Sequence, residues 1–277
     1  MKMFYRRDAG RVYWFSILSL ILITRGPCSI AQSEFSWPGN ARAAVCLTYD
    51  DGLDCHVDIV APALEQHGLR GTFYVTGTSP SLYHRMEEWR GMAERGHELG
   101  NHTLFHPCHR EGNDWVRPEY DLDNYTFPQL MNELRVANSL LKAVDGTEER
   151  TFAYTCTHTT IAGRSFVDSI RTMFRAARGG GAIPDRMEEI DIHNVPSWMA
   201  VDRTGAELIS YVEQAVEKGT LAVIMFHSVG GGYLNVSEEA HEQLLGYLEQ
   251  HRGEIWTAPF REVMEVAGKE LQRGSAH

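Results

Sequence analysis

Two adjacent carboxylates, Asp50 and Asp51, follow an apolar run and precede Gly52. The run, residues 43–47, has the length and composition of a short buried strand. Neighbouring side chains on a strand point apart, but at a strand end that opens into a loop both can face one cleft. Two carboxylates this close should not ionise alike, and they could divide the roles of metal ligand and general base. Asp-Asp-Gly is also common in surface turns, and that alternative stays open.

A pair of histidines four residues apart, His102 and His106, suggests a metal site. On one helical turn such a pair shares a face and can bind one ion. Pro107 keeps this turn short, so we expect it to lie in a loop. Asn101 stands where the zincin pattern His-Glu-x-x-His would need its second histidine, which disfavours that class of metalloprotease. Asp51 is the candidate third ligand, because two histidines and one carboxylate leave an open position for water, as in catalytic zinc sites.

Strands and helices alternate about seven times along the chain, which predicts βαβ units and a parallel sheet in one α/β domain. The apolar strands favour a barrel or a doubly wound sheet covered by helices. A long irregular loop is expected at 107–125. The strands are expected at 43–47, 71–77, 97–101, 151–154, 173–177, 189–195, 221–226 and 255–258, and the helices at 57–67, 82–95, 127–144, 164–172, 204–218, 237–250 and 259–271.

Residues that could do chemistry fall where these strands end. In βαβ folds the loops at the carboxyl ends of the strands form the ligand site. Residues scattered along the sequence that share this edge are therefore candidates for one site. They are Asp50, Asp51, His102, Arg178 and His227.

The first 31 residues have the pattern of a secretory signal peptide. A basic start precedes an apolar run at 12–24, and small residues precede the expected cleavage after Ala31. The run is short for a membrane span, although an uncleaved N-terminal anchor is the alternative. No other stretch is apolar enough to cross a membrane. We therefore expect a signal peptide at 1–31 and one catalytic domain at 32–277, in a secreted or periplasmic protein.

The net charge of −11 bears on the partners of the protein. Five basic residues and one acidic residue in the first 31 contribute +4, which leaves about −15 for the remainder. This charge argues against nucleic acid and anionic membrane surfaces as partners. The sequence does not indicate the oligomeric state.

Four cysteines follow the expected leader, at positions 46, 55, 108 and 156, without Cys-x-x-Cys spacing. Cys108 follows His106 by two residues, and Cys156 lies just past the expected fourth strand, so both should lie at the same end of the sheet. We expect a disulfide between them, because a secreted chain permits it and the long loop needs anchoring. Two buried thiols that never meet are the alternative.

Three sequence blocks resemble the polysaccharide deacetylase family, carbohydrate esterase family 4. They are Thr-Tyr-Asp-Asp-Gly at 48–52, Gly-Thr-Phe-Tyr-Val at 71–75 and Gly-His-Glu-Leu-Gly-Asn-His-Thr-Leu-Phe-His at 96–106. The resemblance covers most of residues 42–265. It implies a distorted (β/α) barrel of about seven parallel strands. It also implies an enzyme that removes acetyl groups from sugars with the help of a divalent metal, for which zinc is the first candidate.

The resemblance also implies roles for individual residues. Asp50 would be the general base, and His227 the catalytic acid at the end of a late strand. Met225 stands where a leucine usually lines the acetyl pocket. The metal ligands would be Asp51, His102 and His106.

The chain departs from the family in its third and fourth blocks. The family has an Arg shortly before Pro-Pro-Tyr that steadies the base, but residues 150–156 read Arg-Thr-Phe-Ala-Tyr-Thr-Cys. An alignment on Phe152 puts Cys156 at the Tyr position, and Tyr154 fits only with a shifted spacing. Arg178 could supply the missing cation or be an ordinary surface residue. An Asp–Trp pair near the acid is only suggested, by Asp191 and Trp198, and Trp198 could be a sugar platform or part of the core.

These parts predict a hydrolase acting on an acetylated glycan or oligosaccharide. A zinc-bound water has a pKa near 7, Asp50 would take its proton, and His227 would protonate the leaving group. A backbone N–H of Tyr154 or Cys156 would help to stabilise the oxyanion. The expected substrate-binding residues are Tyr154, Cys156, Arg178, Trp198 and Met225. The alternatives are a hydrolase of a non-sugar amide C–N bond and a decayed glycan-binding protein, and the choice between N- and O-acetyl groups stays open.

Overall fold

The computed structural model describes residues 35–274 of the 277-residue chain. The signal peptide expected at 1–31 lies outside this range. Within residues 35–274, no helix is long and apolar enough to cross a membrane.

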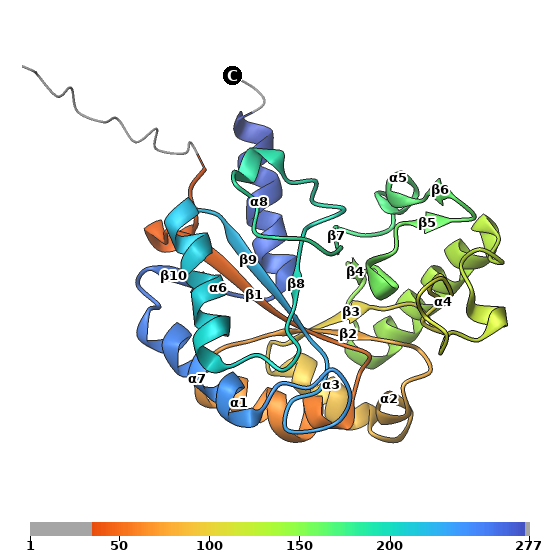
Figure 1. The fold of residues 1–277 in the computed structure, drawn as a ribbon, viewed down its shortest axis with the longest axis horizontal. Coiled ribbons are helices and arrows are strands. Elements are labelled where there is room, and N and C mark those ends of the chain that lie inside the picture. Colours follow the sequence, from red (N-terminus) through yellow and green to blue (C-terminus); the bar gives the residue numbers. More distant parts are fainter. Residues whose placement is uncertain (1–34, 275–277) are drawn as a thin grey trace, which may run out of the picture. The chain divides into compact units, whose positions relative to one another are not determined.

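A parallel sheet organises the described part of the chain (Figure 1). Its strands run in the order β7-β4-β3-β2-β1-β9-β8, and β10 pairs with β1 beside this path. Every strand pair in the sheet is parallel. The strands are β1 (Ala43–Asp50), β2 (Thr72–Val75), β3 (Glu98–Asn101), β4 (Thr151–Ala153), β7 (Ala176–Arg178), β8 (Trp198–Met199), β9 (Leu221–Phe226) and β10 (Ile255–Thr257).

The two edges of the sheet approach each other through the segment that leads into β8. The N–H of Gly179 donates to the carbonyl of Val195 at 2.8 Å, and the N–H of Gly181 donates to the carbonyl of Ser197 at 2.9 Å. These bonds join the end of β7 to the start of β8, so the sheet curves into a distorted, partly closed barrel. The predicted fold class is confirmed.

Helices follow most strands and cover the sheet. Three helices, at 127–145, 205–218 and 238–250, begin with a side-chain cap. The capping oxygens come from Thr126, Thr204 and Ser237, respectively. A five-residue π-helical turn, His56–Val60, precedes α1. The helices are α1 (Ala61–Gln66), α2 (Pro80–His84), α3 (Met86–Glu94), α4 (Phe127–Asp145), α5 (Val167–Ile170), α6 (Gly205–Lys218), α7 (Glu238–Gln250) and α8 (Phe260–Gly274).

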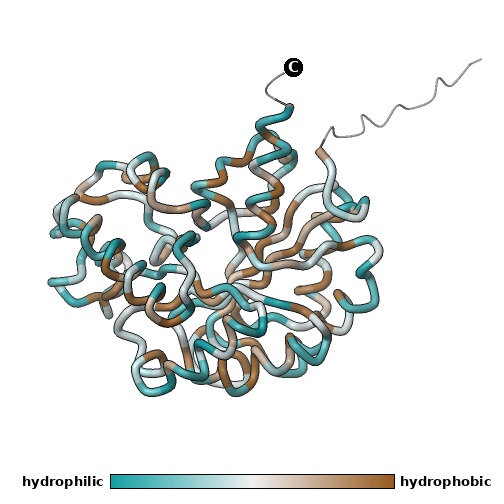
Figure 2. The backbone as a smooth tube through the Cα atoms, turned by 180° about the vertical axis from the view of Figure 1, so that it is seen from behind, coloured by the Kyte–Doolittle hydropathy of each residue, from teal (hydrophilic) through white to brown (hydrophobic). Residues whose placement is uncertain are grey.

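Strand β1 lies at the centre and is buried at all eight positions. Its odd-numbered side chains, such as Leu47 and Tyr49, pack in the core cluster that includes residues of α1, α6 and α7. Its even-numbered side chains, Ala44 and Cys46, pack in the cluster that includes residues of α8. Asp50 continues the even-numbered series, so the alternation of the strand turns its carboxylate to the inner side of the curved sheet. Figure 2 shows the matching hydropathy, with hydrophobic strands inside and hydrophilic turns outside.

Four sequence predictions differ from the observed elements. No strand forms at 189–195, where a short 3-10 turn, Met187–Glu189, leads into irregular chain. The helix expected at 164–172 is reduced to α5, because a small hairpin of β5 (Thr160–Ile161) and β6 (Arg164–Ser165) takes its first residues. The helix expected at 82–95 is broken into α2 and α3 at Arg85, whose φ of −129° is not helical. The two-residue strand β8 was not expected, because it is too short to show a period.

Candidate active site

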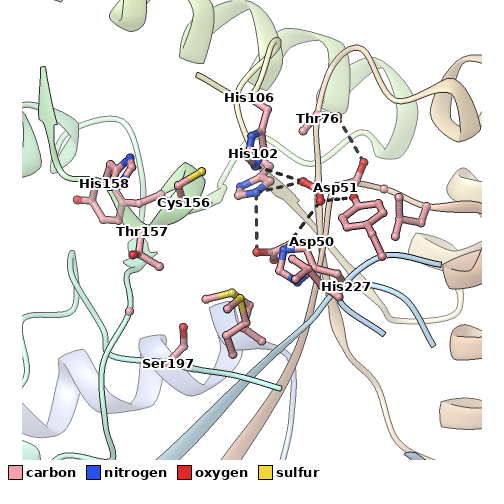
Figure 3. A pocket seen from close by; sticks show the side chains of 18 of the residues that line it. Asp50, Asp51, Thr76, His102, His106, Cys156, Thr157, His158, Ser197 and His227 are labelled. Carbon is pink, nitrogen blue, oxygen red and sulfur yellow. Dashed lines mark hydrogen bonds and ion pairs between the residues drawn. The ribbon is translucent and has the colours of Figure 1, made fainter. Parts of the chain in front are cut away.

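Five of the predicted residues converge at the carboxyl ends of three strands of the sheet (Figure 3). Asp50 ends β1 and Asp51 follows it, His102 follows β3, and His227 follows β9. His106 reaches the same place from the loop after His102. They line a pocket of about 1160 Å³. This slightly exceeds the roughly 300–1,000 Å³ common for small-molecule pockets.

Asp51, His102 and His106 form a group that could hold one metal ion. Asp51 Oδ1 lies 3.6 Å from Nε2 of His102 and 3.4 Å from Nε2 of His106. The three ligand atoms lie within 4.8 Å of one another. A zinc ion about 2.0–2.2 Å from each atom fits this spacing. Within the described residues, Asp51 Oδ1 is buried and accepts no hydrogen bond, as expected of an atom that binds a metal.

The backbone fixes the tautomer of His102. Its Nδ1 lies 2.9 Å from the carbonyl oxygen of Ala153, which can only accept, so Nδ1 carries the proton. Nε2 therefore presents its lone pair towards Asp51 and His106. Burial and the neighbouring His106 lower the pKa of His102 well below its usual value, which keeps the ring neutral. A neutral imidazole oriented by a carbonyl is the usual form of a metal ligand.

His106 reaches the site through a loop and not through the helical turn that the spacing suggests. Thr103 and His106 have φ values of 65° and 53°, outside the right-handed helical region. Glu133 of α4 accepts the N–H groups of Leu104 and Phe105 at 3.0 and 2.9 Å. Thr103 Oγ1 accepts the N–H of His106 at 2.9 Å. These bonds hold the turn, so both imidazoles face Asp51 without a helix.

Asp50 is paired with Arg178 across the inner side of the sheet. A terminal nitrogen of Arg178 donates to Asp50 Oδ2 at 2.6 Å, and both side chains are buried. The guanidinium also lies 5.0 Å from the centre of the Tyr74 ring. Arg178 is therefore not part of the pocket wall, and its expected substrate contact is wrong. It lies behind Asp50, where it can steady the base.

Residues 150–156, which correspond to the family's third block, fit neither of the two alignments considered in the sequence analysis. Arg150 is buried and pairs with Asp145, away from the pocket. Tyr154 lines the pocket, but its N–H donates to the carbonyl of Arg178 at 3.0 Å. Tyr154 therefore cannot supply the expected N–H to an oxyanion. Cys156, with a φ of 51°, also lines the pocket and stays a predicted donor.

The predicted acid, His227, lies beside the metal group, and the predicted hydrophobic residues line the same pocket. His227 Nε2 is 3.9 Å from Asp51 Oδ2, and its buried Nδ1 has no hydrogen-bond partner among the described residues. Met225 and Trp198 line the pocket from β9 and β8. Asp191 instead pairs with Arg171 at 2.6 Å, so it does not form an Asp–Trp pair near His227.

The expected disulfide between Cys108 and Cys156 is confirmed, with Cα atoms 5.9 Å apart. Cys46 and Cys55 are free thiols. The bond joins the loop after His106 to the segment after β4. The irregular character of residues 107–125 is also confirmed, since their regular structure is limited to the 3-10 turn Pro118–Tyr120 and one isolated bridge between Cys108 and Asp121.

Sequence reasoning missed three residues that shape the site. Tyr233 donates its hydroxyl proton to Asp51 Oδ2. His56 is buried and bridges Leu53 N–H, at 3.2 Å, to the carbonyl of His227, at 2.9 Å. His158 lines the pocket beside Cys156. The only signal in the sequence was the glycine run before Tyr233, because these contacts depend on loop geometry.

The predicted resemblance is now supported by comparison with known proteins. Residues 39–160 match the family model for polysaccharide deacetylase. The chain is 28% identical over 129 residues to the peptidoglycan-N-acetylmuramic acid deacetylase PdaA of Bacillus subtilis. The match covers 44% of this chain and 42% of PdaA. It is also 41% identical over 66 residues to a chitooligosaccharide deacetylase of Bradyrhizobium. That match covers 23% of this chain and 29% of the Bradyrhizobium enzyme. The resemblance to the polysaccharide deacetylase family is confirmed.

The fold gives the same relationship over a longer stretch. A putative polysaccharide deacetylase from Mycobacterium smegmatis superposes with a TM-score of 0.60 at 15% identity, covering 86% of this chain and 94% of that one. The likeness shows a shared fold. The chain spans between 10% and 42% of the length of four curated relatives that it matches, the two named above among them.

Proposed function

We propose that this protein is a metal-dependent hydrolase that removes acetyl groups from an acetylated glycan. One observation carries the proposal: a three-ligand group opens onto a pocket that also holds a carboxylate and an imidazole. Asp50 Oδ2 lies 3.8 Å from His102 Nε2, and His227 Nε2 lies 3.9 Å from Asp51 Oδ2. The base and the acid therefore flank the ligand group within one cavity, as acetyl transfer to water requires.

The chain's own residues have distinct tasks in this proposal. Asp51, His102 and His106 would hold a divalent ion, for which zinc is the first candidate. When bound, such an ion lowers the pKa of a water and polarises a carbonyl. Asp50, fixed by Arg178, would take a proton from the attacking water. His227 would give a proton to the leaving amine or alcohol.

The pocket suits an acetyl group on a sugar. Met225 and Trp198 offer apolar surface beside the ligand group, and the Trp198 ring stacks on Tyr211 with centroids 4.6 Å apart. Stacking limits the freedom of the indole, so it can act as a fixed platform. Cys156 is the candidate N–H donor to the developing oxyanion. We also propose secretion or a periplasmic location, based on the leader pattern at 1–31.

One panel tests the proposal. The purified protein is analysed for metal, then assayed for acetate release from chitooligosaccharides, peptidoglycan fragments and acetylated xylan. We expect zinc near one ion per chain and acetate from at least one glycan, both abolished by a chelator and restored by zinc.

Other outcomes would contradict the proposal. Hydrolysis of small cyclic or linear amides without acetate release from any glycan would indicate a C–N hydrolase on the same barrel. Glycan binding with no metal and no turnover would indicate a decayed site. Matched samples of the Asp51→Ala variant control for contaminating esterase.

A further inference from the structure

Residues 156–158 line the side of the pocket that lies across from Asp51 and His227 (Figure 3), and residues 107–109 are joined to them. We name residues 107–109 and 155–160 together the loop wall. Four contacts join its two segments in succession. Thr155 Oγ1 donates to the carbonyl of Pro107, and Cys108 is bonded to Cys156. The N–H of His109 donates to His158 Nδ1 at 3.1 Å, and His109 Nε2 lies 3.0 Å from Thr160 Oγ1.

His109 is itself held from a third direction. Its Nδ1 lies 3.0 Å from Asp123 Oδ1, and its ring lies 4.8 Å from the ring of His158. Both ring nitrogens of His109 are therefore engaged within the wall. His158 differs, because only its Nδ1 has a partner among the described residues, while its ring lines the pocket.

The contact to His109 determines the tautomer of His158. A backbone N–H can only donate, so His158 Nδ1 must be unprotonated and accept. The ring proton of neutral His158 is then on Nε2. Burial and the nearby His109 lower the pKa of His158, which favours this neutral form. The loop wall thus holds an imidazole whose one free polar group is a donor.

We propose that His158 is a specificity-determining residue that donates a hydrogen bond from Nε2 to an uncharged oxygen of the bound glycan. The inference rests on the proposed function of the site and adds one substrate contact to it. A neutral imidazole brings no positive charge, and the same pocket already holds the carboxylates of Asp50 and Asp51. A sugar hydroxyl is therefore a better partner than a substrate carboxylate.

Two substitutions separate this role from a structural one. His158→Asn retains an acceptor at the place of Nδ1 and loses the distal N–H. His158→Gln retains an N–H near the place of Nε2 and loses the acceptor for His109. The measurements are zinc content, thermal midpoint, kcat and KM for acetate release from N-acetylated chitotetraose, and the calorimetric Kd of metal-free protein for the same tetramer.

We expect His158→Asn to raise KM and Kd about fivefold, the effect of one neutral hydrogen bond near 1 kcal/mol. Its zinc content and thermal midpoint should match the parent protein, and kcat should fall less than KM rises. The ratio of kcat/KM on the tetramer to that on a small aryl acetate should also fall about fivefold. His158→Gln should show the opposite pattern, with a lower thermal midpoint and a smaller change in Kd.

The outcomes distinguish this inference from the function on which it rests. A parent protein that binds and deacetylates chitotetraose, together with an Asn variant of unchanged KM and Kd, would overturn the role of His158 alone. Equal loss of thermal midpoint in both variants, with equal KM, would show that His158 only supports the loop wall. A parent protein that neither binds nor deacetylates any glycan of the panel would reject the proposed function, and the inference with it.

Discussion

The two sides of the pocket are built by different means. On one side, Asp50, Asp51 and His102 lie at the ends of β1 and β3, and buried backbone fixes their directions. On the other side, the loop wall has almost no regular structure and is held by a disulfide and side-chain contacts. The sheet orders the first side, whereas individual contacts between loop residues hold the second. Asp50, Asp51 and His102 thus take their positions from strands, whereas the contact proposed for His158 lies on a loop, where binding residues are often found.

The largest effect is expected on the strand side. Asp51→Ala removes the carboxylate that joins the two imidazoles, so zinc and activity should be lost together. Asp50→Asn should keep near-stoichiometric zinc while turnover falls by about 10²–10⁴-fold, because it removes only proton abstraction. Zinc analysis of both variants beside acetate release checks this. Equal metal loss in the two variants would show that the roles of the two carboxylates are assigned wrongly.

His227 offers the next test on the same side. His227→Ala should lower turnover by about 10²–10⁴-fold on an amide substrate, because the leaving amine then lacks its proton donor. The loss should be much smaller on an activated aryl acetate, whose leaving group needs no proton. Steady-state kinetics on both substrates measure the difference. The same loss on both would assign His227 a structural role.

The disulfide tests the loop side. It closes a loop with a sequence separation of 48 residues, and the chain-entropy model gives such a closure about 4 kcal/mol. The Cys108→Ser, Cys156→Ser double variant should therefore unfold at lower urea concentration, with a loss of about 2–4 kcal/mol. Zinc affinity should also fall, since Cys108 Sγ lies 3.6 Å from His106 Nδ1. Parent-like stability in the double variant would contradict this account of the loop wall.

The difference between the two sides also explains what the sequence could reveal. The strand β9, at Leu221–Phe226, has the bounds expected from its apolar run, and α4 begins at Phe127, as expected. Asp51, His102 and His106 could be grouped because parallel strands bring their ends to one edge. Local patterns therefore sufficed wherever burial and strand alternation decide the position of a side chain.

Tertiary contacts decide the rest, and no local pattern reports them. Arg178 pairs with Asp50 over a separation of 128 residues, so the sequence could offer it as a candidate for the missing cation but could not decide between that role and a surface position. The N–H of Tyr154 is taken by a neighbouring strand, which spacing could not show. The segment 189–195 has strand-like composition but forms no strand. Its last residues instead make single backbone hydrogen bonds to β7 on the way to β8.

A pH experiment extends the comparison to the buried support of the strand side. His56 Nδ1 accepts from Leu53 N–H, so Nε2 carries the proton that it donates to the carbonyl of His227. Burial lowers the pKa of His56 to about 4 in the folded protein. The unfolded chain, with a histidine pKa near 6.5, takes up the proton first as the pH falls. The stability contributed by neutral His56 is therefore complete above about pH 6.5 and is lost between there and about pH 4.

Protonation linked to His56 should lower the free energy of unfolding by about 3 kcal/mol between about pH 6.5 and pH 4. The slope for this one proton is near 1.4 kcal/mol per pH unit. Urea unfolding of the metal-free protein at pH 7, 6 and 5 measures the slope, and about 2 kcal/mol of the loss falls within that range. His56→Asn, which keeps an acceptor for Leu53, should be less stable at pH 7 and show a slope shallower by about one proton. His97 and His241, whose pKa values burial lowers to about 4 and about 3, should sustain the remaining slope. An unchanged slope in the variant would exclude His56 as a contributor.

A smaller effect is expected at Tyr233, which lies on a loop and bonds to the strand side. This residue follows a glycine run and is half exposed, yet its hydroxyl donates to Asp51 Oδ2. The bond occupies one carboxylate oxygen and leaves Oδ1 towards the imidazoles, so Tyr233 should hold Asp51 as a one-oxygen ligand. Removal of such an outer contact typically weakens metal binding by about 10–100-fold. Because Tyr233 is half exposed, Tyr233→Phe should lie near the lower limit of this range, about tenfold in zinc Kd. Competition with a chelator measures that Kd, and Tyr83→Phe, a highly exposed tyrosine away from the pocket, is the matched control. A zinc Kd equal to that of the control would mean that the sheet alone orients Asp51.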